Sequence, residues 1–340
     1  MSTDRIWRLV PAGSAYRLEQ SSRPRPEPGP GQVVVRVHAV SLNYRDHINL
    51  HNLANRNVAN RIPVSDGAGE VVAVGPDVTS WKPGDRVAGC LFQTWLSDRF
   101  DMRYHQQDLG GTIDGMLAEH VLLNAEGVVG IPAEYSYAEA ATLPCAALTT
   151  WTALFPRGGL QAGDTVLALG TGGVSVFALQ LATAAGARVI VTSSRDDKLL
   201  RARQLGAWQT INYTATPGWE REVWKLTERR GVDHVIEVGG PGTLEKSMAC
   251  VAAGGHIALI GVLTGFGPTS ASLFPLVAKN VRLNGIYVGP RTEFEAMNRF
   301  LAAQRIRPVI DRTFSFDEAP AAYAHLASGE HFGKIVIQLA

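Results

Sequence analysis

The sequence contains few cysteines and few charged residues. Only three cysteines occur among 340 residues, and Cys90, Cys145 and Cys250 lie far apart. Their spacing supports neither a disulfide framework nor a Cys-x-x-Cys zinc site. Charged residues make up 19% of the chain, and 32 Lys and Arg nearly cancel 31 Asp and Glu, leaving a net charge of +1. Because the chain carries no field that would attract a polyanion, we expect no nucleic acid as a partner.

Long apolar runs are missing as well. Residues 1–10 already contain one acid and two arginines, and no later stretch reaches about 18 uncharged apolar residues, the length of a membrane-spanning helix. We therefore expect no secretion signal and no membrane span. Together with the scattered cysteines, this predicts a soluble protein of the cytoplasm, where thiols stay reduced.

Glycine, by contrast, is abundant. The 35 glycines follow no Gly-X-Y period and are spread through apolar segments, which excludes both a collagen-like chain and a low-complexity chain. Single hydrophobic cores rarely grow beyond roughly 250 to 300 residues. The length of 340 residues therefore predicts two packed cores.

The first part of the chain has the pattern of a mainly β domain. β-branched runs occur at residues 32–40, 67–74 and 86–88, and turns rich in Gly and Pro separate them. Residues 95–115 then form a polar stretch of mixed charge. We interpret this stretch as a long surface loop, either a functional lid or an insertion.

From Asp164 onward, strands and helices alternate. The predicted strands are residues 164–170, 187–194, 208–213, 232–240 and 255–262, and the predicted helices between them are 174–186, 198–206, 219–230 and 243–254. This alternation, with strands that are apolar throughout, predicts an α/β fold with a doubly wound parallel sheet buried on both faces. The tail ends in a strand at residues 333–340. We expect a mainly β domain of residues 1–146 and 291–340, and an α/β domain of residues 147–290.

The strongest chemical signal follows the first strand of the α/β domain. Gly170, Gly172 and Gly173 lie between this strand and a helix that begins near Val174. Glycines at such a turn let the backbone approach a pyrophosphate, and the helix N-terminus supplies free N–H groups and partial positive charge. Ser175 replaces the third glycine of the usual motif, and it is small enough for close packing. The pattern predicts a dinucleotide site.

The end of the second strand indicates which dinucleotide binds. An NAD site offers Asp or Glu to the ribose 2′-hydroxyl at this point. Here the residues are Ser193, Ser194 and Arg195, with Lys198 following. Hydroxyl groups and a guanidinium suit a 2′-phosphate, although two acids at residues 196–197 weaken the electrostatic argument. We predict NADP(H) as the cofactor.

Four motifs together resemble a known superfamily. Residues 41–46 (SLNYRD), 66–72 (DGAGEVV) and 82–87 (KPGDRV), followed by the turn at Gly170, come in the order seen in medium-chain dehydrogenases/reductases. Over nearly its whole length the chain resembles the zinc-free quinone oxidoreductase branch, whose members are often labelled zinc-type alcohol dehydrogenase-like. The resemblance implies a GroES-like catalytic domain and a Rossmann domain.

The same resemblance allows a test for zinc. Zinc-dependent members hold their catalytic metal with a Cys, a His-Glu pair and a later Cys. By motif matching, Asn43 takes the place of the first Cys, Ser65 and Asp66 take the place of the pair, and only Cys145 remains. One thiolate does not build a tetrahedral zinc site. A reorganised site using His47, His51 or Asp66 follows no recognised metal spacing, and we expect no metal.

Without a Lewis acid, alcohol oxidation loses its means of stabilising an alkoxide. Hydride delivery to a quinone or an α,β-unsaturated carbonyl gives a delocalised anion that hydrogen-bond donors can stabilise. The resemblance places Asn43 and Tyr44 in the loop that faces the substrate, so both are candidate catalytic donors. Alternatively, Tyr44 is a packed aromatic with a satisfied hydroxyl, and solvent supplies the proton.

The resemblance assigns further cofactor contacts. The remaining expected contacts are Thr149, Gly172, Gly173, Val174, Tyr213, Gly239, Gly240, Val262, Leu263, Tyr287 and Val288. Lys334 resembles a residue that reaches the pyrophosphate from the first domain. Its alternative role is that of a surface lysine.

These observations predict an NADPH-dependent oxidoreductase that reduces a small quinone or α,β-unsaturated carbonyl without zinc. One alternative is an NAD(P)-dependent alcohol dehydrogenase, and another is a non-enzymatic NADPH-binding protein. The resemblance also implies a homodimer joined through the edge strands of the Rossmann sheets. Residues 281–288 are the candidate edge.

Overall fold

The computed structural model describes residues 2–269 and 271–339. The chain divides into two compact units. The first unit runs to Leu148 and resumes at Gly289, and the second comprises Thr149–Val288. No helix in the described part of the chain is both long enough and apolar enough to cross a bilayer.

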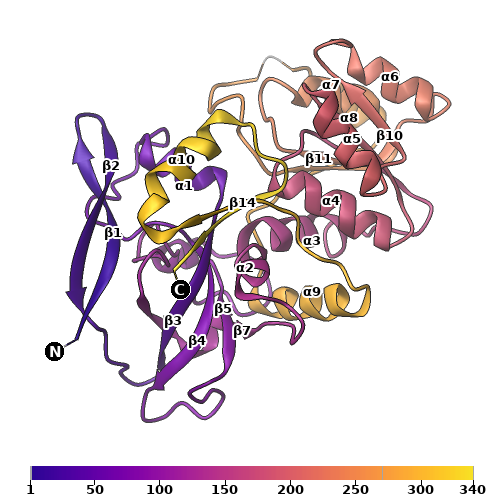
Figure 1. Ribbon diagram of the computed structural model, residues 1–340. Helices are drawn as coiled ribbons and strands as arrows, with labels where there is room; N and C mark the ends of the chain where they lie inside the picture. The colour runs from indigo at the N-terminus through magenta and orange to yellow at the C-terminus, as the bar shows by residue number, and fades with distance from the viewer. Residues whose placement is uncertain (1, 270, 340) are drawn as a thin grey trace. The chain divides into compact units, whose positions relative to one another are not determined.

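The first unit is built around a seven-stranded sheet (Figure 1). Its strand order is β14-β15-β3-β4-β5-β7, with β6 paired to β3. The strands are β3 (Gln32–Leu42), β4 (Asp66–Val74), β5 (Arg86–Gly89), β6 (His120–Asn124), β7 (Val128–Gly130), β14 (Ile310–Ser315) and β15 (Lys334–Gln338). Its helical segments are α1 (Tyr44–Leu50), η1 (Met102–Gln107), η2 (Ala125–Gly127), α2 (Tyr137–Ala140), η3 (Leu143–Ala147), α9 (Arg291–Ala303), η4 (Phe316–Glu318) and α10 (Ala319–Ser328). The C-terminal strand β15 thus pairs with β3 from the start of the chain.

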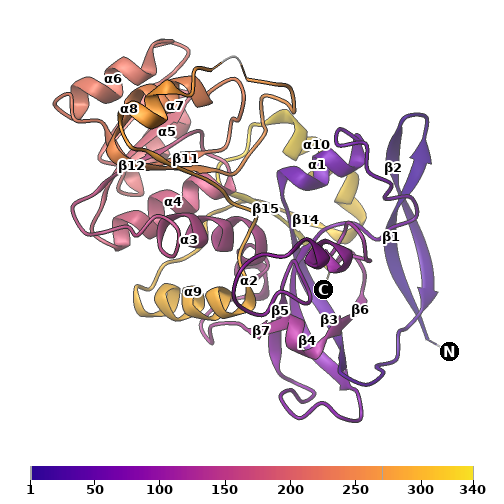
Figure 2. The same ribbon diagram turned by 180° about the vertical axis from the view of Figure 1, so that it is seen from behind.

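Strand β3 is the centre of this core. Val33, Val35 and Val37 are almost fully buried, and β-branched side chains pack well on a pleated surface. Strands β1 (Thr3–Ala12) and β2 (Ala15–Pro24) instead pair only with each other and form a two-stranded ribbon at the margin of the unit (Figure 2).

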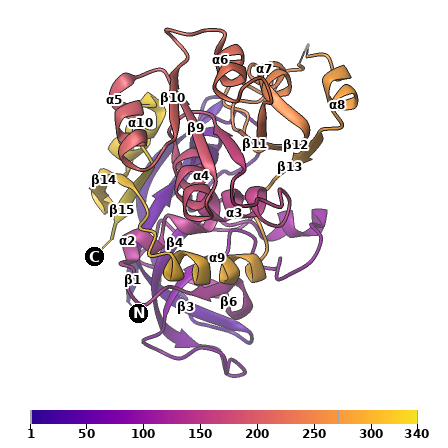
Figure 3. The ribbon, with the colours of Figure 1, turned by 90° about the vertical axis from the view of Figure 1, so that its right-hand side faces the viewer.

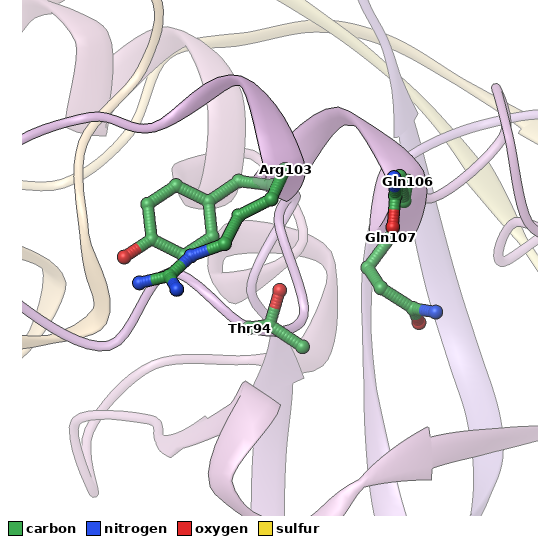
Figure 4. Close-up of a pocket in the computed structure, with 5 residues that line it drawn as sticks. Thr94, Arg103, Gln106 and Gln107 are labelled. Atoms are coloured by element: carbon green, nitrogen blue, oxygen red, sulfur yellow. The ribbon is translucent and has the colours of Figure 1, made fainter.

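The predicted surface loop at residues 95–115 is packed more closely than expected. Asp108 and Leu109 are buried, and Leu109 belongs to the hydrophobic core. The segment also forms the 3₁₀ helix η1, where Arg103 lies over the ring of Tyr104. The segment is a long loop with many exposed residues, and apolar side chains between its polar residues anchor it to the core. A hollow of about 330 Å³ remains on its outer side, lined by Thr94, Arg103, Tyr104, Gln106 and Gln107 (Figure 4).

The second unit is a six-stranded parallel sheet with the order β10-β9-β8-β11-β12-β13. The strands are β8 (Thr165–Ala168), β9 (Arg188–Ser193), β10 (Gln209–Asn212), β11 (Val232–Glu237), β12 (Val251–Leu259) and β13 (Arg282–Gly285). The helices are α3 (Leu148–Leu154), α4 (Gly173–Ala184), α5 (Asp196–Gln204), α6 (Trp219–Leu226), α7 (Leu244–Cys250) and α8 (Phe274–Ala278). Helix α4 lies on one face of the sheet, and α6 and α7 lie on the other (Figures 1 and 3). The predicted α/β class, with a mainly β part and a doubly wound part, is confirmed.

Two predicted helices are too long. The helix expected at residues 219–230 ends at Leu226. Residues 243–254 were expected to be helical throughout, but α7 ends at Cys250 and β12 begins at Val251. The backbone at Gly254 has a φ of +71°, a left-handed conformation that no α-helix contains. The β-branched Val251 and the two glycines at 254–255 therefore favour the strand over the helix.

Candidate functional site

The predicted phosphate turn has the geometry that the sequence pattern requires. Strand β8 ends at Ala168, and Gly170 has a φ of +78°, which glycine adopts without steric cost. A Cβ atom built on Gly170 would meet no atom within 4 Å. The backbone N–H of Gly170 donates to Thr192 Oγ1 at 3.2 Å, and the Ser175 hydroxyl donates to the Leu169 carbonyl at 2.6 Å. Both hydrogen bonds fix the turn and leave its outer side open.

Helix α4 starts directly after this turn. Gly172 precedes the helix with extended backbone angles, and Gly173 and Val174 form its first turn. The first N–H groups of a helix have no partner within the helix, so they are free to bind a phosphate. The Thr150 hydroxyl donates to the Val174 carbonyl at 3.1 Å, and its neighbour Thr149 is buried on α3. This open glycine turn and helix N-terminus fit a dinucleotide.

The residues predicted to read the 2′-phosphate lie between β9 and α5. The Arg195 guanidinium donates two hydrogen bonds of 3.0 Å to the Asp197 carboxylate. Asp196 accepts from the Asn212 amide at 2.8 Å. Both acids of this turn are therefore engaged by neighbouring side chains, which offsets the repulsion that they would exert on a phosphate.

The other residues predicted at this turn differ in exposure. Ser194 is exposed, whereas Ser193 is buried and its hydroxyl accepts from the Arg195 N–H at 3.3 Å. Lys198 is buried on α5. Tyr213 follows β10, is 42% exposed, and donates its N–H to the Ser193 carbonyl. The structure thus brings Tyr213 beside the end of β9.

The predicted contacts after β11 and β12 also lie together. Gly240 has a φ of +83°, and a Cβ atom there would lie 3.2 Å from Val262 Cα. The Thr264 hydroxyl donates to the Gly239 carbonyl at 2.8 Å. A side chain at Gly240 would therefore push the segment after β11 away from the segment after β12. Parallel strands bind ligands at this carboxyl edge, so the location suits a cofactor.

Sequence reasoning missed one residue that organises this edge. Glu237 ends β11 and is fully buried. One of its carboxylate oxygens accepts from the N–H groups of Gly239 and Gly240 and from the Thr243 hydroxyl, and the other accepts from Ser247. A glutamate at the end of a buried strand, two residues before a glycine pair, was the signal that could have identified it.

Three further predicted contacts follow the last strands. Leu263 is 49% exposed and Tyr287 is 45% exposed, so both side chains are accessible. Val288 is buried and has a φ of +59°, which is unusual for a β-branched residue.

The first predicted catalytic residue, Asn43, belongs to a buried polar cluster in the first unit. Asn43 and Tyr44 stand at the start of α1, and the Asn43 side chain is 8% exposed. The ammonium of Lys334, itself only 3% exposed, donates to Asn43 Oδ1 at 2.6 Å and to the Leu42 carbonyl at 2.7 Å. The same ammonium lies 4.0 Å from Asp66 Oδ2. Lys334 is therefore not the surface lysine of the alternative interpretation.

Asp66 connects this cluster to the remaining cysteine. Its carboxylate is fully buried, accepts the Ser65 hydroxyl at 2.7 Å and accepts the backbone N–H of Cys145 at 3.0 Å. Burial, together with the negative charge of Asp66, raises the pKa of the Cys145 thiol to about 12. Burial also lowers the pKa of Lys334 from its usual value, although Asp66 opposes this shift.

The second predicted donor has a different environment. The Tyr44 ring is partly buried and stacks on His47 with 5.5 Å between ring centroids, and His47 lies 4.4 Å from His51. Burial lowers the pKa of His47, with a further contribution from His51. His47 therefore favours its neutral form, and its ring packs against the ring of Tyr44.

Both parts of the chain match known protein families. Residues 29–133 match the alcohol dehydrogenase GroES-like domain, and residues 173–303 match the zinc-binding dehydrogenase family. A zinc-type alcohol dehydrogenase-like protein of Schizosaccharomyces pombe is 43% identical over 91% of each chain. The chain belongs to the medium-chain dehydrogenase/reductase superfamily. The predicted resemblance to this superfamily is thus confirmed, and the chain is one of its oxidoreductases.

Two further members extend the comparison. A quinone oxidoreductase of Pseudomonas aeruginosa is 32% identical over 96% of each chain. A crystal structure of a Sinorhizobium meliloti protein of the alcohol dehydrogenase type is 42% identical, covers both chains completely and has a TM-score of 0.94. Members of the superfamily bind nicotinamide cofactors, consistent with the glycine turn before α4.

Proposed function

We propose that this protein is a zinc-independent, NADPH-dependent reductase of a small quinone or α,β-unsaturated carbonyl. The observation that carries the proposal is the side-chain amide of Asn43. Its Nδ2 group is buried and has no hydrogen-bond partner among the described residues. A buried donor without a partner is costly, unless a ligand accepts its hydrogen bond.

The proposed chemistry matches a donor of this kind. A bound NADPH would supply the hydride, and the glycine turn with the start of α4 would hold its pyrophosphate. Addition of hydride to the β-carbon of an enone leaves negative charge on the carbonyl oxygen. The Asn43 amide would donate to that oxygen, with Tyr44 as the second donor or as the source of the proton.

The matched zinc positions support a reaction without zinc. A zinc ligand set needs deprotonated thiols, neutral imidazoles or carboxylates around one point. Here Asn43 and Ser65 replace two of the matched ligands, and the Lys334 ammonium lies beside Asn43 and Asp66, where its positive charge opposes a bound cation. The described residues contain no group of three His, Cys, Asp or Glu side chains that would hold a metal. The side chains at these positions therefore do not fit a zinc ion.

The turn between β9 and α5 supports NADPH over NADH. The residue directly after β9 is not a carboxylate. Ser193, Ser194 and Arg195 are consecutive in the sequence, so two hydroxyl groups and a guanidinium occur together at this turn. Asp196 and Asp197 are held by Asn212 and Arg195. This arrangement provides donors for a 2′-phosphate and restrains the nearby acids.

We also propose a cytoplasmic location. All three cysteines are free thiols, and Cys90 and Cys250 are buried. Burial raises the pKa of both thiols to about 12, so they are poor nucleophiles. Unpaired cysteines of this kind suit a reducing compartment.

A substrate panel with both cofactors tests the proposal. We expect purified protein to oxidise NADPH with 1,4-benzoquinone or 2-cyclohexen-1-one, with a higher kcat/KM than for NADH and with little turnover of saturated aldehydes. Zinc in the same preparation should be far below one ion per chain. Turnover of aldehydes and alcohols only, with stoichiometric zinc, would instead establish an alcohol dehydrogenase, the name that several relatives carry. Tight NADPH binding without turnover would establish a non-enzymatic binding protein.

A further inference from the structure

The pairing of two distant strands places Lys334 beside Asn43. Strand β15 pairs antiparallel with β3, and Ile335 lies opposite Leu42. Lys334 begins β15 and Asn43 directly follows β3, so the register alone makes these residues neighbours. They are 291 residues apart in the chain.

The chemistry of the two groups fixes the orientation of the amide. A lysine ammonium has three donors and no acceptor, so only the oxygen of an amide can face it at hydrogen-bond distance. Lys334 Nζ lies 2.6 Å from Asn43 Oδ1. The Nδ2 group is therefore directed away from the ammonium, and it is this buried group that lacks a partner among the described residues.

The main chain holds Asn43 from its other side. The backbone N–H of Asn43 donates to the Asp46 carboxylate at 2.8 Å, and the Lys334 ammonium also donates to the carbonyl of Leu42. Both the backbone and the side-chain oxygen of Asn43 are thereby fixed. Only the Nδ2 donors remain for an external acceptor.

We propose that Lys334 is a positioning residue for the reduction: its ammonium fixes the Asn43 amide so that Nδ2 donates to the substrate oxygen. This inference rests on the proposed function, because it takes Asn43 as the donor to the developing anion. The same ammonium lies 4.0 Å from Asp66 Oδ2, so it also places positive charge beside this buried carboxylate.

A double-mutant cycle tests the coupling. In the full-length protein with NADPH and 2-cyclohexen-1-one, Lys334→Met should lower kcat by about ten- to a hundredfold, the effect expected for loss of a charged hydrogen bond. In the Asn43→Ala background the same substitution should lower kcat less than about twofold, since Lys334 acts through Asn43. Losses that multiply in the double variant would overturn the proposal.

Further variants separate positioning from folding and from cofactor binding. Lys334→Gln keeps a donor for Asn43 Oδ1 without the charge, so it should retain more activity than Lys334→Met and remains informative if Lys334→Met does not fold. Lys225→Met, at an exposed ion pair on α6, is the matched control and should leave kcat unchanged. The NADPH Kd, measured by fluorescence titration, should change less than about threefold in Lys334→Met. A tenfold rise in Kd with unchanged kcat would instead identify Lys334 as a pyrophosphate ligand.

A spectroscopic measurement separates this inference from the proposed function. In protein labelled with ¹⁵N-asparagine, the Asn43 Nδ2 signals are those missing in Asn43→Ala. They should shift in Lys334→Met without any substrate, because the amide loses its charged partner. Unchanged signals would refute the positioning role even if enone reduction is found. Shifted signals in a protein that reduces no enone would refute the proposed function and retain the Lys334–Asn43 coupling.

Discussion

Two buried carboxylates in this chain are stabilised to very different degrees. Glu237 accepts hydrogen bonds from two backbone N–H groups and two hydroxyls, so its charge is well solvated by the protein. Asp46 is equally buried, but one of its oxygens, Oδ1, has no partner in the described part of the chain. Burial accordingly raises the pKa of Asp46 to about 6, against the opposing effect of Arg45. The missing hydrogen bond at Oδ1 leaves the negative charge of Asp46 poorly compensated in its buried position.

This difference predicts a pH dependence of stability at Asp46. Because its folded-state pKa of about 6 lies above the ordinary value of 3.8, the folded state binds the proton more tightly than the unfolded state. The contribution to the free energy of unfolding is present below about pH 4 and is lost as the pH rises to about 6, by up to about 3 kcal/mol. Asp46→Asn should remove this loss.

Urea unfolding at pH 4, 5, 6 and 7 measures the effect. The difference in unfolding free energy between Asp46→Asn and the wild type should grow in favour of the variant as the pH rises. Asp101→Asn, at an exposed ion pair with Arg103, provides a control in which no such trend is expected. If the difference in unfolding free energy between variant and wild type stays constant with pH, the pKa of Asp46 is not raised in the folded state, and the prediction is wrong.

At the scale of elements, the sequence predicted buried elements better than exposed ones. The apolar strands β8, β9 and β11 were each located, since a parallel sheet covered on both faces selects continuous apolar runs. Strands β1 and β2 were not predicted, because most of β2 is exposed or half-buried and its polar sequence carries no core pattern. The predicted helix at residues 243–254 extended beyond the end of α7, because the residues after Cys250 are apolar or small and suit either a helix or a strand.

The turn between β9 and α5 gives a prediction for cofactor choice. Arg195→Ala removes a guanidinium and also frees the Asp197 carboxylate that it holds. The KM for NADPH should therefore rise by about ten- to a hundredfold, while the KM for NADH should change less than about threefold. Arg203→Ala tests for a general charge effect, because Arg203 lies on the same helix and contacts Thr210. If the KM values for NADPH and NADH change equally, Arg195 does not recognise the 2′-phosphate.

At the scale of the whole molecule, the parallel sheet ends on one side in strand β13. This edge strand lies within residues 281–288, where the resemblance implied dimerisation. The preceding helix α8 exposes Phe274 by 70% and Val277 by 78%. Large exposed apolar side chains beside an open strand edge favour association, and we propose a homodimer through this surface.

Light scattering coupled to size-exclusion chromatography tests the dimer. The wild type should have the mass of two chains at micromolar concentration, and Val277→Glu should shift it toward one chain because a charge would be buried in the interface. Leu200→Glu, an exposed leucine on α5, is the control and should remain dimeric. A monomeric wild type would exclude the proposed surface.

The candidate site was predictable only where it is local in sequence. The glycine turn before α4 and the Asn43–Tyr44 pair are carried by short motifs, because the conformation of a turn depends mainly on adjacent residues. The partners of those motifs come from elsewhere. Glu237 organises the edge at Gly239 and Gly240 through contacts that involve side chains up to ten residues away. Lys334 reaches Asn43 across almost the whole chain.

The sequence by itself determined the superfamily, the α/β class and the phosphate turn, because periodicity, glycine positions and motif order are properties of neighbouring residues. Only the tertiary structure decided what surrounds Asn43. The pairing of β15 with β3 excludes water from Lys334 and brings its ammonium to the amide oxygen, which leaves Nδ2 as the available donor. A contact between residues 43 and 334 depends on strand register, and register is set by the packing of the entire sheet.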